Sequence, residues 1–423
     1  MLYYLFDWLQ KAFDFPGSRL MQYISFRAIV VLILSIVISI WFGKIFIRFM
    51  KRHQYFEQQR DEKTDPFNTS KKEVPTMGGI VILLAILIPC LLVGKLCNVY
   101  FILMVITTLI LGAVGFADDY IKTFKHRKDG INGWVKIGAQ VLLGLIVGLT
   151  LRYSPDVVMN EKVTTRIENN VEVVHKTPDV KSTRTTIPFF KNNDLNYADL
   201  FGFLGEKWKY GAGWIFFVLL TVFVVAAVSN GSNLNDGMDG MAAGNSAIIG
   251  VAILVLAYVS GSAVWADYLN VMYIPGSEEI VIFMCAFVGS LVGYLWYNSY
   301  PAQMFMGDTG SLTVGGIIAV AAIIIHKELL LPIICGVFLM ESVSVILQKV
   351  YFKYTKKRGS PKRIWKRTPI HDHFRTSMDK VQPPTPVKFK GNGVLYHETK
   401  ITIRTWIITI GLAALALLTL KIR

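Results

Sequence analysis

The stretch VYFILMVITTLILGAVGFADDYIK, residues 99–122, sets an apolar run directly against two acids and a lysine. Its apolar part, 99–117, is long enough to cross the roughly 30 Å hydrocarbon core of a bilayer as a helix. A charged carboxylate beside hydrocarbon is costly to hold, so Asp118 and Asp119 are candidates for a functional site. Adjacent helical residues point in different directions, so we expect the two acids to have different tasks. A helix-end charge pair with Lys122 is the structural alternative.

Apolar runs of comparable length recur along the chain. They are 24–49, 78–97, 134–151, 213–229, 241–260, 279–297, 311–326, 329–352 and 402–420. Of the 423 residues, 53% are hydrophobic and only 17% are charged, whereas soluble domains carry about a quarter charged residues. We therefore expect an all-α polytopic integral membrane protein with about ten transmembrane helices, forming a single catalytic domain over residues 1–423.

Lysine and arginine gather in alternate connections between these runs. The segments 50–76, 118–133 and 353–400 are dense in basic residues, and the connections at 98, 261–278 and 326–328 are nearly bare. The positive-inside rule places the basic segments, including the loop 353–400, in the cytoplasm. The net charge of +15 then describes an inner face suited to anionic lipid and phosphate substrates. We expect no nucleic-acid partner.

The one long connection on the predicted outer side is 152–212. Within it, VTTRIENNVEVVHK at 163–176 alternates apolar and polar residues around Asn169-Asn170, a pattern typical of a β-hairpin. The segment shows no constellation of catalytic residue types. We expect a small β-rich extracytoplasmic insertion between the fourth and fifth spans.

Two further polar segments fall on the same predicted face as Asp118. They are SNGSNLNDGMDG at 229–240 and FMGDTGS at 305–311. Carboxylate and amide oxygens suit a hard divalent cation and sugar hydroxyls, while glycines let backbone N–H groups approach phosphate. A polar turn between helices, and a simple N-cap at Asp308, are the structural alternatives. We favour one acidic site, assembled from distant segments, that holds a divalent metal on a phosphate.

A short basic stretch, PKRIWKRTPIHDHF at 361–374, carries His371 and His373. A His-x-His pair can ligate a transition metal, but neither cysteine nor a third histidine lies nearby. Donors to a diphosphate suit the stretch better, and a basic face on anionic lipid is the remaining alternative.

Five motifs in order resemble those of the phospho-N-acetylmuramoyl-pentapeptide transferases, within the polyprenyl-phosphate N-acetylhexosamine-1-phosphate transferase superfamily. They are KKEVPTMGG at 71–79, DDYIK at 118–122, NLNDGMDG at 233–240, FMGDTGSL at 305–312 and TPIHDHF at 368–374. The resemblance covers most of the chain apart from 152–212. It implies transfer of phospho-MurNAc-pentapeptide from UDP-MurNAc-pentapeptide to undecaprenyl phosphate, giving lipid I and UMP, with Mg²⁺ required. It also implies a homodimer in the bacterial inner membrane, with its active site on the cytoplasmic face.

The resemblance also implies a role for each matching residue. Asp308 matches the Mg²⁺ ligand, Asp118 the carboxylate that deprotonates the lipid phosphate, and Asp119 its essential neighbour. His371 is the fourth residue implied in catalysis. The implied substrate-binding residues are Lys71, Thr76, Lys122, Lys136, Asn230, Asn233, Asp236, Asp239, Asn298, Phe305 and His373. The middle position of the family's three-histidine motif is Asp372 here, so its role does not carry over.

Two rival functions remain at this point. A sibling enzyme transfers phospho-GlcNAc from UDP-GlcNAc to the same lipid, although PTMGG and TPIHDHF favour the muramoyl reaction. An ion-coupled transporter also uses intramembrane carboxylates, but near the midplane and often in paired repeats. Here the acids gather on one face. Sequence does not separate a single displacement from a covalent phospho-sugar intermediate.

Overall fold

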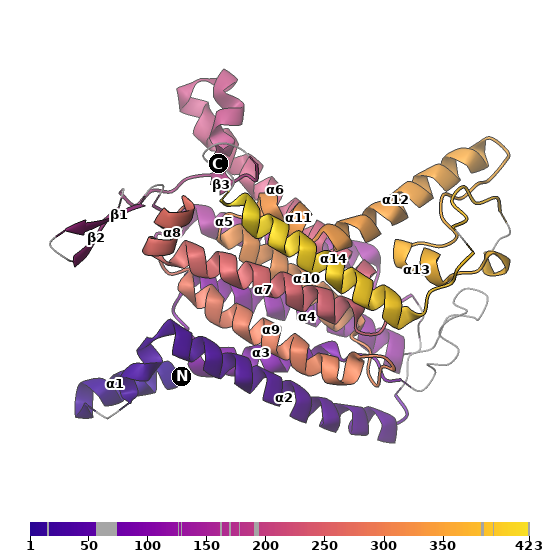
Figure 1. The fold of residues 1–423 in the computed structure, drawn as a ribbon, viewed down its shortest axis with the longest axis horizontal. Coiled ribbons are helices and arrows are strands. Elements are labelled where there is room, and N and C mark those ends of the chain that lie inside the picture. Colours follow the sequence, from indigo (N-terminus) through magenta and orange to yellow (C-terminus); the bar gives the residue numbers. More distant parts are fainter. Residues whose placement is uncertain are drawn as a thin grey trace.

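The structure, a computed structural model, is a bundle of long helices with small β elements at one end (Figure 1). It describes residues 1–14, 17–55, 74–125, 127, 129–160, 163–168, 171–176, 178–189, 194–381, 385–391 and 393–421. The long helices are α2 (Ile24–Arg52), α4 (Val99–Phe124), α5 (Gly133–Tyr153), α6 (Glu206–Asn235), α7 (Met241–Gly261), α9 (Glu278–Asn298), α10 (Gly307–Ile324), α12 (Gly336–Lys357) and α14 (Glu398–Thr419).

Shorter elements connect and flank these helices. The short helices are α1 (Leu2–Phe13), α3 (Gly79–Val93), α8 (Ala263–Leu269), α11 (Leu331–Ile334) and α13 (Ile370–Arg375). Single turns of 3₁₀ helix occur at η1 (Ser18–Gln22), η4 (Glu328–Leu330) and η5 (Met378–Lys380), and a longer one at η3 (Tyr197–Leu204). Two antiparallel pairs of strands, β1 (Val163–Glu168) with β2 (Val171–Lys176) and β3 (Arg184–Thr186) with β4 (Asp194–Asn196), complete the fold.

The predicted fold class is confirmed, with fewer complete spans than the ten expected. Among the described residues, eight helices are long and apolar enough to cross a membrane, namely α2, α4, α5, α6, α7, α9, α10 and α14. The run 329–352 forms a helix pair that bends by 78° between α11 and α12, where Cys335 leaves the helical conformation. It makes a ninth span if the bent pair is counted as one crossing, and otherwise corresponds to a re-entrant segment. The run 78–97 forms only α3, whose 15 residues extend about 22 Å at about 1.5 Å per residue.

Burial separates a protein core from a lipid-facing surface. Helix α10 packs against α4 and α6, and α9 packs against α2 and α7. Both α9 and α10 are buried along nearly their whole length. Helices α2 and α6 instead expose large apolar side chains, such as Trp41 and Phe223. A helix that is apolar all round and buried is a central one, and an exposed apolar face suits acyl chains.

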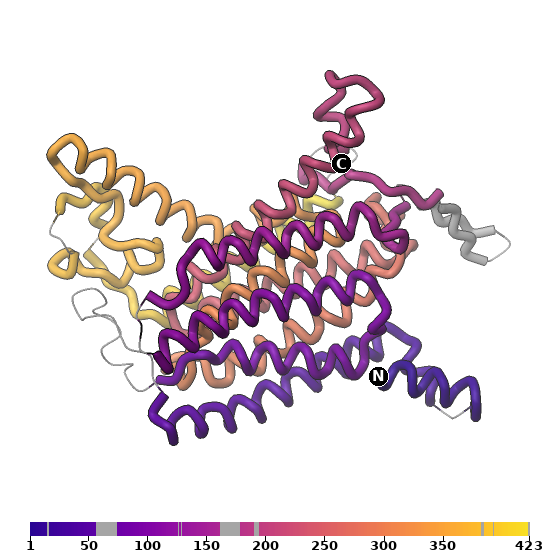
Figure 2. Tube along the Cα trace, turned by 180° about the vertical axis from the view of Figure 1, so that it is seen from behind, coloured from indigo at the N-terminus to yellow at the C-terminus, as the bar shows by residue number. Residues whose placement is uncertain are grey.

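The two ends of the bundle differ in content. Both termini lie at the end that also carries β1, β2 and α8, as seen from the two opposite sides in Figures 1 and 2. At the other end, α4 and α6 finish, α5, α7 and α10 begin, and α13 lies beside them. The motif segments that the structure describes therefore gather at one end of the bundle. Each lies where one long helix ends or the next one begins.

The insertion 152–212 does more than project from the bundle. The predicted hairpin is present as β1 and β2, while β3 and η3 pack over the C-terminal end of α10. Thr186 donates its N–H to the His326 carbonyl at 3.0 Å, and the buried Lys327 ammonium donates to the Thr186 hydroxyl at 2.6 Å. The Tyr197 hydroxyl donates to Glu328 Oε1 at 2.8 Å. Burial raises the pKa of Tyr197, so its phenol remains a donor.

The hydrogen bond from Tyr197 gives a test of this closure. We expect Tyr197→Phe to lower the free energy of unfolding by about 1–3 kcal/mol, because buried Glu328 then loses a donor. The measurement is thermal unfolding in detergent, with Tyr210→Phe as the matched control, since Tyr210 is exposed. Equal unfolding midpoints for the two variants would contradict the closure.

Candidate active site

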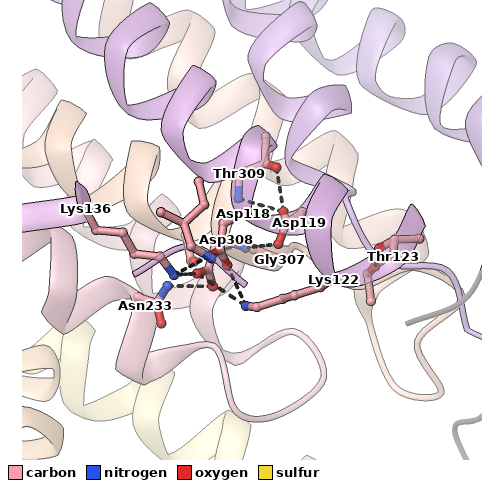
Figure 3. Close-up of polar contacts among 12 residues, drawn as sticks. Asp118, Asp119, Lys122, Thr123, Lys136, Asn233, Gly307, Asp308 and Thr309 are labelled. Atoms are coloured by element: carbon pink, nitrogen blue, oxygen red, sulfur yellow. Dashed lines mark hydrogen bonds and ion pairs between the residues drawn. The ribbon is translucent and has the colours of Figure 1, made fainter. Parts of the chain in front are cut away.

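Four helix ends bring their polar side chains together in one cluster (Figure 3). The last turns of α4 carry Asp118 and Lys122, four residues apart and therefore on one side of the helix. Asn132 caps α5 by accepting from the Trp134 N–H at 3.1 Å, which places Lys136 in the first turns. Helix α10 begins at Gly307, so Asp308 lies in its first turn.

Asp118 is fully buried and is surrounded by donors. Its Oδ2 lies 2.7 Å from the Lys122 Nζ, and its Oδ1 lies 2.9 Å from the Lys136 Nζ. The backbone N–H of Ile131 also donates to Oδ1 at 2.7 Å. Gly130 permits this approach, because a Cβ there would lie 2.4 Å from Oδ1. The carboxylate is thus held in a charge-assisted network that satisfies a buried anion.

Asp308 shares the same two lysines and is the more accessible acid. Its Oδ2 forms an ion pair with Lys136 and lies 3.5 Å from the Lys122 Nζ. The Asn233 amide donates to its Oδ1 at 2.9 Å. The Asp308 side chain keeps 16% of its surface exposed, against none for Asp118. Asp308 is therefore the carboxylate of this pair that an incoming ligand reaches first.

Asp119 points away from the lysines and binds the start of α10. Its Oδ1 accepts the N–H of Asp308 at 3.0 Å, and its Oδ2 accepts the N–H of Thr309 at 2.8 Å and the Thr309 hydroxyl. The first N–H groups of a helix lack intrahelical partners, so a carboxylate from a neighbouring helix is a favourable cap. The two adjacent acids therefore point to different partners, Asp118 to the lysines and Asp119 to the start of α10.

The three acids offer oxygen ligands to a metal ion. One oxygen from each of Asp118, Asp119 and Asp308 falls within a group whose members lie within 4.8 Å of one another. Hard carboxylate oxygens suit Mg²⁺, which usually takes one or two carboxylates together with substrate phosphates. Both oxygens of Asp119 already accept helix N–H groups. The donor set thus fits a divalent metal, and Asp308 offers its most accessible carboxylate.

The loop between α6 and α7 places its polar residues in different surroundings. Asp239 is buried and accepts the Ala302 N–H at 3.0 Å, while the Asn298 amide joins Gly240 N–H to the Met304 carbonyl. These two residues connect neighbouring loops. Asp236 faces the cluster, and its pKa is raised to about 7, by burial first and then by Asp308, Asp119 and Asp239.

Other predicted substrate residues line the edges of the site. The Asn230 amide donates to Gln140 at 2.9 Å, and the Thr76 and Thr123 hydroxyls lie 3.3 Å apart. Phe305 is half-buried, and its backbone pairs with Pro75 and Gly78 at 2.9 and 2.8 Å. The backbone around Thr76 is thereby fixed against the start of α10. Lys71 lies outside the described residues.

The histidine motif forms the adjoining wall on α13. His371 faces Glu341 of α12, with Nδ1 3.2 Å from Oε2. His373 accepts the Lys366 N–H at 3.3 Å, and burial followed by the Lys366 charge lowers its pKa. Neither histidine takes part in the ion pairs and hydrogen bonds that Asp118 and Asp308 make with described residues.

Asp372, which replaces the expected middle histidine, binds arginine. Its Oδ1 lies 2.7 Å from Arg375 Nη2 and its Oδ2 3.3 Å from Arg367 Nε. Arg375 also pairs with Glu398 of α14 at 2.6 Å and donates to the Gly237 carbonyl at 3.4 Å. Asp372 therefore holds Arg375 in place, and Arg375 links α13 to the loop of Asp236 and to α14.

Sequence reasoning missed Glu341, Gln140 and Arg375. Glu341 is an acid inside the apolar run 329–352, which is the same signal that singled out Asp118. Arg375 directly follows the histidine motif. Gln140 gives no comparable signal, since a single amide in a helix has many structural uses.

Comparison with known proteins places these features in a family. The model of glycosyl transferase family 4 matches residues 101–326. The phospho-N-acetylmuramoyl-pentapeptide-transferases of Bacteroides fragilis and Bacteroides thetaiotaomicron are each 62% identical over 424 residues, covering all of both chains. That of Flavobacterium psychrophilum is 48% identical over 431 residues, again covering all of both chains. Full coverage in both directions means that these relatives share the length of the chain, with 152–212 included.

Gly307 allows a direct test of the Asp119 contact. Its φ is +70°, and a Cβ there would lie 2.5 Å from Asp119 Oδ2. We expect Gly307→Ala to lower the free energy of unfolding by more than about 1 kcal/mol, because alanine is strained at positive φ. Gly133→Ala is the matched control, since nothing lies within 4 Å of a Cβ at that helical position. Thermal unfolding in detergent measures both, and an unchanged Gly307→Ala protein would refute the contact.

Proposed function

The chain belongs to the phospho-N-acetylmuramoyl-pentapeptide-transferase family, and from this premise we propose the reaction that its acidic cluster performs. The enzyme transfers phospho-MurNAc-pentapeptide from UDP-MurNAc-pentapeptide to undecaprenyl phosphate. The products are lipid I and UMP, and the step is the first membrane reaction of peptidoglycan synthesis. The 62% identity to transferases of the muramoyl donor favours this reaction over the sibling transfer of phospho-GlcNAc.

The proposal rests on one observation: two lysines, Lys122 and Lys136, each pair with both Asp118 and Asp308. An oxygen of the lipid phosphate attacks the phosphorus that bears the sugar, and the bond from that phosphorus to UMP breaks. The electron pair leaves with UMP, and no group is oxidised or reduced. Phosphoryl transfer needs mainly positioning and charge neutralisation. Lys122 and Lys136 supply positive charge where phosphate oxygens arrive.

We assign the roles of the acids from their surroundings. Asp308, the accessible acid, would hold Mg²⁺, which would supply a Lewis acid for the diphosphate oxygens. Asp118 takes the proton of the lipid phosphate once substrate phosphates draw the lysines toward them. Asp119 keeps Asp308 in place through the start of α10. Asn233 donates to Asp308 and orients it.

The bundle geometry supports an interfacial site. The acceptor lipid has a long apolar tail that stays in the bilayer. Its phosphate therefore lies at the membrane surface, where the spanning helices end and the acidic cluster is located. The chain is a multi-pass membrane protein, and we assign its site-bearing end to the cytoplasmic face of the bacterial inner membrane. That end carries the basic last turn of α12, with Lys356 and Lys357, in keeping with the positive-inside rule. We also propose a homodimer, as the family resemblance implies.

Donor preference tests the reaction. We expect purified protein in detergent, with undecaprenyl phosphate and Mg²⁺, to release UMP from UDP-MurNAc-pentapeptide and not from UDP-GlcNAc. A chelator should abolish release, and added Mg²⁺ should restore it. Release from UDP-GlcNAc would assign the sibling reaction, and silence with both donors in folded protein would refute the proposal.

Removal of the accessible acid tests the metal assignment. We expect Asp308→Asn to lower kcat by at least about 100-fold, because metal-borne charge stabilisation is worth several kcal/mol. UMP release is the measurement, with insertion and folding checked in parallel. Asp156→Asn makes the same change at an exposed position and should keep full activity. Normal turnover by Asp308→Asn would show that another residue holds the metal.

A further inference from the structure

A second buried acid, Glu341 on α12, lies outside the acidic cluster. Its side chain is fully buried in a helix that is otherwise largely apolar there. A buried carboxylate is strongly unfavourable unless a cation or hydrogen-bond donors meet it. Among the described residues, the basic side chain that lies within 4.0 Å of this carboxylate is that of His371. The burial of Glu341 is therefore explained by one histidine.

The contact fixes His371 at two points. Glu341 Oε2 lies 3.2 Å from the ring nitrogen Nδ1 and accepts the His371 backbone N–H at 3.4 Å. His371 keeps only 2% of its surface exposed. A carboxylate beside Nδ1 favours the proton on that nitrogen and directs the other ring nitrogen away.

The other ring nitrogen, Nε2, meets the loop that faces the acidic cluster. A Cβ at position 237 would lie 2.2 Å from Nε2, so Gly237 and the imidazole are in close contact. Asp372 Oδ1 lies 3.7 Å from the same nitrogen. Gly237 directly follows Asp236, whose carboxylate is influenced by both Asp308 and His371. His371 thus contacts the loop between α6 and α7 through Nε2 and α12 through Nδ1.

We propose that Glu341 is a positioning residue for transfer, acting through His371. It holds the proton on Nδ1 and sets Nε2 toward the Gly237 turn, beside Asp236 and the acidic cluster. This inference rests on the proposed function. A carboxylate–histidine pair of this kind orients the imidazole without touching the reacting atoms.

Attachment of the neighbouring loop to α12 does not depend on Glu341. Gln348, two turns further along α12, accepts the N–H groups of Ile364 and Trp365 at 2.9 and 3.2 Å. Thr355 accepts the Lys362 N–H at 2.9 Å. The segment leading to α13 is therefore fixed by other side chains, and Glu341 is left with the imidazole.

A double-mutant cycle on UMP release tests the pair. We expect Glu341→Gln to lower kcat by about 10- to 100-fold, the range seen when a residue that orients a histidine is changed. His371→Gln should lower kcat at least as much. The double variant should be no slower than His371→Gln, because Glu341 then has no imidazole to orient. Ser344→Ala, one turn along the same helix, is the control and should keep the wild-type kcat.

Two outcomes would overturn the proposal. Additive losses would mean that Glu341 acts independently of His371, and a lowered unfolding temperature with unchanged kcat would mean a structural role alone. The tautomer of His371 gives a readout that needs no activity. In ¹⁵N-histidine spectra, assigned with His371→Gln, Glu341→Gln should alter the Nδ1 signal of His371, and an unaltered signal contradicts the proposal. Absent UMP release by wild-type protein would refute the proposed function, while the spectra would still decide the pairing.

Discussion

The contact between Asp119 and the start of α10 is the constraint on which the site depends. Helix α10 is buried almost throughout, so its first N–H groups cannot be satisfied by water. A carboxylate from α4 accepts two of them, which fixes the last turns of α4 beside the first turns of α10. Asp308 lies one residue into α10, so the same contact decides where the accessible acid points. The missing side chain of Gly115 allows α4 to pack closely against α10, because a Cβ there would lie 2.4 Å from the Asp308 carbonyl oxygen.

Charge balance explains how the cluster is stable before any substrate binds. Asp118 is fully buried and Asp308 largely so, and two lysines from α4 and α5 pair with them. The ammonium groups stand where cationic charge is needed, and phosphate oxygens compete for the same positions. In the proposed reaction, substrate binding exchanges the anionic partners of Lys122 and Lys136, which avoids leaving buried charge unpaired. A divalent ion on Asp308 would likewise neutralise charge on the diphosphate oxygens.

Polar contacts also hold α10 at its far end, some 18 residues away. There the insertion closes over His326, Lys327 and Glu328 through Thr186 and Tyr197. The central helix is therefore anchored at both ends, by a carboxylate from α4 on one side and by the insertion on the other. The relatives that match the full chain share its length, as expected if the insertion belongs to the scaffold of α10.

The sequence by itself determined the helical membrane class, the hairpin at 163–176 and the segments that form the site, because apolar length, alternation and charge are properties of a local stretch. Residues far apart, such as Asp118 and Asp308, were also placed on one face, since counting spans fixes the side on which each connection lies. Only the tertiary structure decided that Asp119 binds a helix start while Asp118 meets lysines, that Asp372 binds arginine, and that Glu341 faces His371. The tertiary structure also decided that α3 is short and that the helix bends between α11 and α12. These outcomes depend on which neighbouring helix offers a donor or a surface, and that information is absent from any single segment.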